Sequence, residues 1–183
     1  MRFFFLLLVL VAAPASQAQS DEAERVAVAY LAALADSAYA EAAALVDPET
    51  ISFVATRLRG EPVADESEEM ALFRQLSRRG LDDMFERRTG IALSDAVESM
   101  DPLAFHALLL EHGFAGQESW TALRVGAHPV DSVRDGEFVH VLFRYEGSPV
   151  PGQAPGLFAL STREIDGRWH VVPVAESHER IGI

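Results

Sequence analysis

The sequence of 183 residues contains no cysteine, no lysine and no asparagine. Without cysteine, the chain has no disulfides, no thiolate metal ligands and no cysteine nucleophile. Without lysine, it has neither a Schiff-base lysine nor the lysine of a phosphate-binding P-loop. All fifteen basic residues are therefore arginine, and the fold must depend on its apolar core.

Positive charge is also scarce, since the formal net charge is -13. Such an acidic chain is a poor partner for nucleic acid or for an anionic membrane surface. The sequence also lacks the motifs GxSxG, HExxH and GxGxxG, which are signatures of serine hydrolases, zinc peptidases and dinucleotide-binding proteins. Composition and motifs together give no signature of a known catalytic class.

The first eighteen residues have the pattern of a secretory signal peptide. Arg2 supplies the positive charge, residues 3–13 form a short apolar run, and Ser16-Gln17-Ala18 matches a small-x-small cleavage site. A membrane span needs about twenty apolar residues, which is longer than this run. We therefore expect a periplasmic or secreted protein whose mature chain begins near Gln19.

The remaining residues, 19–183, are enough for one domain. Apolar residues at helical spacing and capping residues predict helices up to residue 113. After that point apolar and polar residues alternate, as in strands. The predicted helices are 21–35, 38–46, one starting at Asp47-Pro48, one between Asp65 and Gly80, 81–88, and one from Asp101-Pro102 to Gly113. The predicted strands are 123–133, interrupted at His128-Pro129, then 138–145, 157–165 and 169–174.

Two Asp-Gly pairs, at 135–136 and 166–167, are typical of tight turns between antiparallel strands. Helices followed by an antiparallel meander predict an α+β fold. Within the strand 138–145, Val139, Val141 and Phe143 alternate with His140 and other residues of mixed polarity.

Neither face of this strand has the composition of a freely solvated surface. We expect Val139, Val141, Phe143 and Tyr145 to lie in the core. The second face, which includes Leu142, then meets a second subunit or frames a pocket. An isologous homodimer is the commonest way to bury such a face.

The order of these elements resembles the nuclear-transport-factor-two-like superfamily. The resemblance rests on the first helical region AERVAVAYLAALADSAYAEAAALVDPETI, on its Asp36-Ser37-x-Tyr39 step, and on the Asp-Gly-Arg-Trp of residues 166–169. It implies helices packed on a curved antiparallel sheet, in the shape of a cone with a cavity at the wide end. Residues 60–113 are then an additional helical segment. The superfamily includes isomerases, dehydratases, hydrolases and non-catalytic modules, so the resemblance does not specify an activity.

Four residues are candidates for ligand binding: Tyr30, His140, Arg144 and His170. His140 and Arg144 share one face of a strand and could hold an anion, although a basic pair at a rim or dimer face is the commoner arrangement. Tyr30 could orient a ligand inside a cone, yet a tyrosine on an apolar helix stripe usually packs in the core. His128, His140 and His170 could form a metal site only if their strands are neighbours, and we expect no metal or cofactor.

We therefore expect an exported, non-catalytic domain that binds a small apolar ligand or a protein partner through a cone cavity or a sheet face. The alternative is a cofactor-free acid/base enzyme of the isomerase, dehydratase or hydrolase type. In that enzyme Tyr30, His140 or His170 would transfer protons, and the three side chains would have to converge on one cavity.

Overall fold

A computed structural model describes residues 2–59, 80–112, 126–145 and 156–172. It has an α+β architecture with a four-stranded antiparallel sheet. The chain divides into two compact units, one formed by Met1–Asp47 with Glu118–Ile183 and the other by Pro48–Gln117. The first unit contains α1 (Arg2–Ala35), α2 (Tyr39–Ala44), β1 (His128–Asp135), β2 (Phe138–Tyr145), β3 (Gly156–Ile165) and β4 (Arg168–Val172). The second contains α3 (Pro48–Arg59), a helix at residues 80–89, α5 (Leu93–Ser99) and α6 (Pro102–Glu111).

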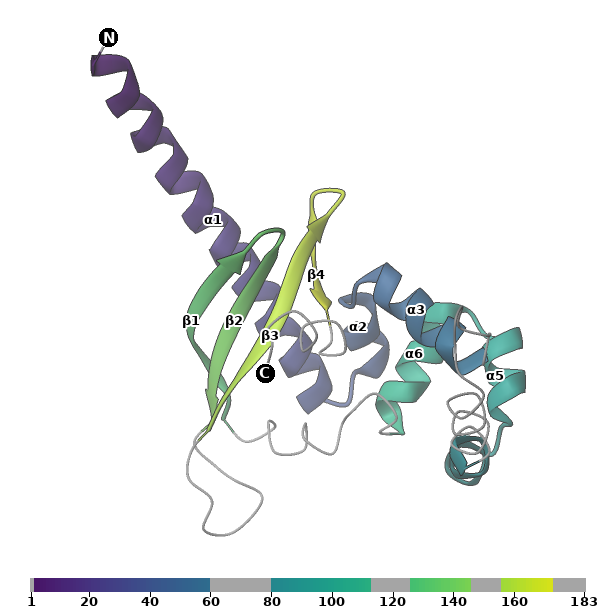
Figure 1. Cartoon of the computed structure of the whole chain (residues 1–183). Coiled ribbons are helices and arrows are strands. Elements are labelled where there is room, and N and C mark those ends of the chain that lie inside the picture. The colour runs from purple at the N-terminus through teal and green to yellow at the C-terminus, as the bar shows by residue number, and fades with distance from the viewer. Residues whose placement is uncertain (1, 60–79, 113–125, 146–155, 173–183) are drawn as a thin grey trace, which may run out of the picture. The chain divides into compact units, whose positions relative to one another are not determined.

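The strands form a meander in the order β1-β2-β3-β4, as Figure 1 shows. In the hairpin between β3 and β4, Ile165 pairs with Arg168, so Asp166 and Gly167 form a two-residue turn. Both have positive φ, 51° and 76°, as a type I′ turn requires, and Asp-Gly is the pair that tolerates this conformation. The turn predicted at residues 166–167 is confirmed.

The first hairpin is displaced by one residue from the predicted Asp-Gly turn. Asp135 pairs with Phe138, so the turn consists of Gly136 and Glu137. Only Gly136 has positive φ, at 60°, which fits the first position of a type II′ turn. The glycine therefore determines where this hairpin reverses.

Strand β1 lies at one edge of the sheet and contains an irregularity between Pro129 and Asp131. Proline cannot donate a hydrogen bond to a neighbouring strand, which restricts it to sheet edges and bulges. The edge position expected of a strand with this proline is confirmed, but the strand is not interrupted at His128-Pro129: β1 begins at His128, and the irregularity follows Pro129. Gly126 and Ala127, predicted as strand, lie before β1, and residues 123–125 lie outside the described residues.

One face of the sheet belongs to the core of the first unit, and we call it the α1 face. Val139, Val141 and Phe143 of β2 are buried on this face, in agreement with the sequence pattern. The side chain of Tyr145, the fourth predicted core residue, is not among those that the structure describes. Their cross-strand partners include Thr162 and Leu160 of β3. These β3 residues are buried as well.

Helix α1 contacts all four strands (Figure 1). Ser20 is hydrogen-bonded to Ser132, and the Gln19 side chain accepts a hydrogen bond from Arg134. Ser132 and Arg134 pair with Val141 and Val139. Gln19 and Ser20 of α1 therefore contact β1 on the α1 face. The buried residues of α1 recur every three or four positions, as expected for one helix stripe: Ala23, Ala27, Tyr30, Ala33 and Leu34.

A short segment after α2 extends the sheet beyond β4. Val46 forms a parallel bridge with Val171. The Asp47 amide donates to the Val171 carbonyl at 2.9 Å, and the Val171 amide donates to the Leu45 carbonyl at 2.8 Å. This pairing covers part of the β4 edge and fixes Asp47, the last residue before α3.

The second unit is helical and has its own apolar core. Phe85 and Phe105 contact each other with ring centroids 6.2 Å apart, and residues of α3, α5 and α6 complete the cluster: Ala55, Leu93, Ala96, Val97 and Leu109. Helix α6 begins where the sequence predicted, because the Asp101 carboxylate accepts hydrogen bonds from the Leu103 and Ala104 amides. Helix α5 was not predicted.

Among the described residues, none of the helices combines the length and the apolar character that crossing a membrane requires. Helix α1 includes most of the predicted signal peptide and the predicted helix 21–35. The signal peptide, the single domain at 19–183 and the additional segment at 60–113 remain predictions.

Candidate ligand-binding face of the sheet

The second face of the sheet, which we call the opposite face, carries three of the four predicted site residues. Pairing between strands places the following side chains together on it: His128, Asp131, Val133 and Asp135 of β1; Phe138, His140, Leu142 and Arg144 of β2; Leu157, Ala159, Ser161, Arg163 and Ile165 of β3; and Arg168, His170 and Val172 of β4. His140, Arg144 and His170 therefore share one surface. Apolar and polar side chains are mixed across it.

In the middle of the sheet, exposure on the opposite face decreases from β1 towards β4. In the row that crosses the middle of the sheet, Val133 is 51% exposed, His140 is half-buried, and Ser161 and Val172 are buried. Leu157, at the end of the sheet next to Arg144, is 61% exposed. The main accessible part of this face therefore lies over β1, β2 and the first half of β3, and Arg168 of β4 is exposed at the far end.

The His140 ring is held from two sides. Its Nδ1 lies 2.9 Å from the buried Ser161 hydroxyl on β3. The ring also stacks with Phe138, with centroids 6.4 Å apart and 18° between the ring planes. Because this hydrogen bond uses Nδ1, Nε2 remains for a ligand, as donor or acceptor according to the tautomer.

Arg144 and His128 form a basic pair at one end of the face. They are direct cross-strand partners, and both side chains are exposed. His140 lies four residues from Arg144 on the same strand, which is about 13 Å at the ordinary rise of a strand. The register therefore places Arg144 closer to His128 than to His140.

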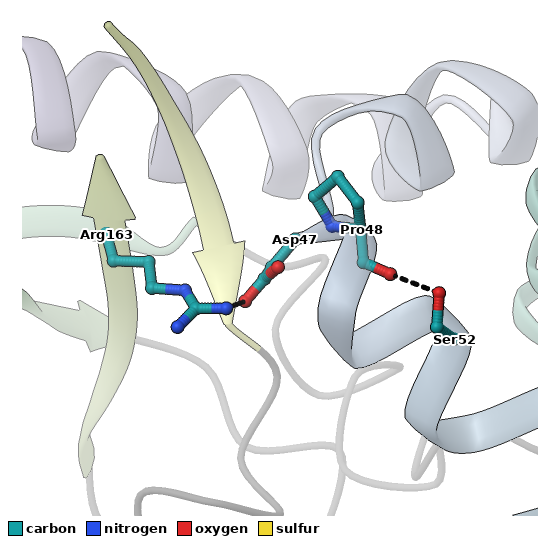
Figure 2. Close-up of polar contacts among 4 residues, drawn as sticks. All are labelled: Asp47, Pro48, Ser52 and Arg163. Atoms are coloured by element: carbon teal, nitrogen blue, oxygen red, sulfur yellow. Dashed lines mark hydrogen bonds and ion pairs between the residues drawn. The ribbon is translucent and has the colours of Figure 1, made fainter. Parts of the chain in front are cut away.

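Arg163 and Asp47 form an ion pair at the β4 side of the opposite face, shown in Figure 2. The guanidinium and carboxylate lie 2.5 Å apart, and the Asp47 side chain is fully buried. His170 is the cross-strand partner of Arg163. Its Nδ1 is buried and makes no hydrogen bond within the part of the chain that the structure describes.

The structure does not bring Tyr30 together with the three residues of the opposite face. Tyr30 belongs to the buried stripe of α1, and only 2% of it is exposed. Burial raises the pKa of its hydroxyl above the usual value of a tyrosine, because the charged phenolate is poorly solvated there. The hydroxyl is therefore a weaker acid than that of an exposed tyrosine.

The strand histidines are also separated from one another. His140 and His170 lie two strands and two residues apart by register, which corresponds to roughly 12 Å between their Cα atoms. His128 lies a similar distance from His140 at the other end of β1. Within the described ranges, no group of three or more histidine or carboxylate side chains is arranged to hold a metal ion.

Two buried polar residues were not predicted as features of interest. Asp47 was interpreted only as a helix start, and its partner Arg163 is distant in sequence. His106 of α6 is 3% exposed, and neither ring nitrogen has a hydrogen-bond partner among the described residues. The only signal for His106 was its position in an otherwise apolar helix, PLAFHALLLE.

Comparison of the chain with models of protein families, with curated proteins and with solved structures finds no match. The functional argument therefore depends on the opposite face itself.

Proposed function

We propose that the chain is an exported, non-catalytic binding protein that holds a small apolar ligand on the opposite face of its sheet. The observation that carries this proposal is the exposure of large apolar side chains, Val133 and Leu157, on a face that also carries Phe138, Leu142 and the oriented His140 ring. Apolar surface with a few fixed polar groups is typical of small-molecule sites.

The size of the accessible area favours a small ligand over a protein. The accessible area is about two strand spacings wide and about six strand residues long, which gives on the order of 200 Å². A stable protein interface buries about 800 Å² on each partner. A homodimer, which the sequence suggests, would need further surface beyond this patch. The cone suggested by the resemblance would curve the sheet around the helices and leave the opposite face on its outer, convex side, so the proposal rests on the sheet face rather than on a cone cavity.

The acid/base enzyme is the second candidate, and the hydrogen bond between His140 and Ser161 favours it. A histidine oriented by a hydroxyl can act as a general base. Tyr30 is buried on α1, however, and His170 is about 12 Å away, so His140 would act without either of them. An enzyme of this kind would lose activity in His140→Gln while retaining ligand affinity.

Binding of N-phenyl-1-naphthylamine, a neutral apolar fluorophore, tests the proposal. We expect saturable binding that Val133→Gln and Leu157→Gln each weaken about fivefold to tenfold, because each removes about 1 kcal/mol or more of apolar contact. The matched control is Val28→Gln, since Val28 of α1 is exposed and apolar but lies away from the sheet face. Equal effects of Val28→Gln and Val133→Gln, or an absence of saturable binding, would contradict the proposal.

A further inference from the structure

The basic pair at the end of the opposite face has few partners. Within the described residues, Arg144 has no hydrogen bond or ion pair. His128 makes one contact, in which Nδ1 lies 3.3 Å from the Gly126 carbonyl oxygen, and Nε2 remains unused. Two exposed basic side chains thus stand directly opposite each other, in a chain whose net charge is -13.

The charges around this pair favour an anion. Side chains directly opposite on neighbouring strands have Cβ atoms about 5 Å apart, and like charges at that distance repel. The repulsion grows when His128 is protonated, and a carboxylate bound between the two side chains would relieve it. Among the described residues, the nearest acid on this face by register is Asp131, whose Oδ1 accepts a hydrogen bond from the Ser132 amide at 2.8 Å.

Apolar side chains begin immediately beside the pair. Leu157, 61% exposed, is the cross-strand partner of Arg144 on the side away from His128. Leu142 and Ala159 form the next row along the strands together with Asp131 of β1, followed by Val133 and His140. From Arg144 to Phe138 the face is about 20 Å long, which is enough for an extended alkyl chain of medium length.

We propose that Arg144 and His128 bind the carboxylate of an amphipathic ligand whose apolar chain lies along Leu157, Leu142 and Val133. This inference rests on the proposed function and specifies its ligand class as alkyl carboxylates. The planar guanidinium of Arg144 can donate two parallel hydrogen bonds to a carboxylate. His128 contributes a further hydrogen bond and, when protonated, a second positive charge.

The test compares decanoate with decan-1-ol, which share the apolar chain and differ in the head group. Calorimetry at about pH 6 should give decanoate at least about tenfold tighter binding than decan-1-ol, because a charge-assisted hydrogen bond contributes more than a neutral one. Among the described residues, the other charged groups that face His128 by register are Arg144 and Asp131.

Arg144→Gln should weaken decanoate about tenfold and leave decan-1-ol unchanged, and Arg144→Lys should restore only part of the loss. His128→Gln should also weaken decanoate and leave decan-1-ol unchanged, because it removes the hydrogen bond of the imidazole to the carboxylate. Arg168→Gln is the matched control, because Arg168 is exposed on the same face at the far end of the sheet. Since these side chains are exposed, the variants should fold, as circular dichroism can verify.

Three outcomes would overturn the carboxylate site. If decanoate and decan-1-ol bind equally, the head group is not recognised, although the proposed apolar binding stands. If Arg168→Gln weakens decanoate as much as Arg144→Gln does, the effect is one of net charge alone. If neither ligand binds, both the carboxylate site and the proposed function are wrong.

Discussion

At the scale of single residues, the most unusual group is His106. Its imidazole is buried in α6, and neither nitrogen is hydrogen-bonded within the described residues. A buried polar group without a partner costs about 1–3 kcal/mol. Burial also lowers the pKa of His106 from 6.5 to about 4, because the imidazolium is poorly solvated.

This lowered pKa predicts that the protein loses stability in acid. The unfolded chain binds a proton at His106 more readily than the folded chain does, so the free energy of unfolding decreases as pH falls from about 6.5 towards about 4. We expect His106 to account for a loss of about 2–3 kcal/mol between pH 7 and about pH 4.5. Urea unfolding of the wild type and of His106→Leu at both pH values measures the difference.

The side chains around His106 support its role as the main cause of this effect. Helices α3 and α5 contact α6, and their described titratable side chains are exposed: Glu49, Arg59, Asp95 and Glu98. His112→Leu is the control, because His112 ends the same helix and is only half-buried. The same acid response in His106→Leu and in the wild type would refute this explanation.

At the scale of elements, main-chain hydrogen bonds and a buried ion pair hold the extended segment after α2. Main-chain hydrogen bonds join Leu45 and Asp47 to Val171, and the Asp47 carboxylate binds Arg163 across β4 (Figure 2). The same figure shows the Ser52 hydroxyl donating to the Pro48 carbonyl at 2.9 Å within α3. Asp47 therefore links the sheet edge to the residue at which α3 begins.

Replacing Asp47 should be costly because its partner is largely buried. In Asp47→Ala, the Arg163 guanidinium, whose side chain is 14% exposed, loses its carboxylate. Breaking a buried pair in this way costs about 3–5 kcal/mol. In the control Glu22→Ala, the exposed pair between Glu22 and Arg25 is lost, and exposed pairs contribute at most about 1 kcal/mol. Equal losses in thermal unfolding would contradict the account.

The sequence pattern correctly predicted the features that neighbouring residues in the chain determine. The alternation in Phe138–Tyr145 predicted which β2 residues are buried, and the Asp166-Gly167 pair predicted a turn that needs positive φ. Helix α5 was missed because Ala92, at its N-cap, makes no side-chain cap, and the helix has only seven residues. Its stability depends on Leu93, Ala96 and Val97 packing in the core of the second unit.

The candidate site was only partly predictable, for a related reason. Strand alternation placed His140 and Arg144 on one face, but the register that pairs Arg144 with His128 is a property of two strands together. The pairing of Asp47 with Arg163 joins residues far apart in the chain. Tyr30 was named as a candidate because a cone was expected, and its burial on α1 favours the alternative interpretation, a core tyrosine.

At the scale of the whole molecule, the proposed binding surface belongs to the first of the two compact units. The first unit provides a sheet whose α1 face is buried and whose opposite face is partly exposed, and the second unit has a separate helical core. In a chain whose net charge is -13, Arg144 and His128 form an exposed pair of basic side chains on the opposite face. The central claim is that the opposite face holds an apolar ligand.

Intermolecular nuclear Overhauser effects between N-phenyl-1-naphthylamine and the methyl groups of the protein test this claim most directly. We predict contacts to the methyl groups of Val133, Leu142 and Leu157, all on the opposite face. Contacts confined to exposed apolar residues elsewhere, such as Val28 or Leu103, or no contacts at all, would contradict it.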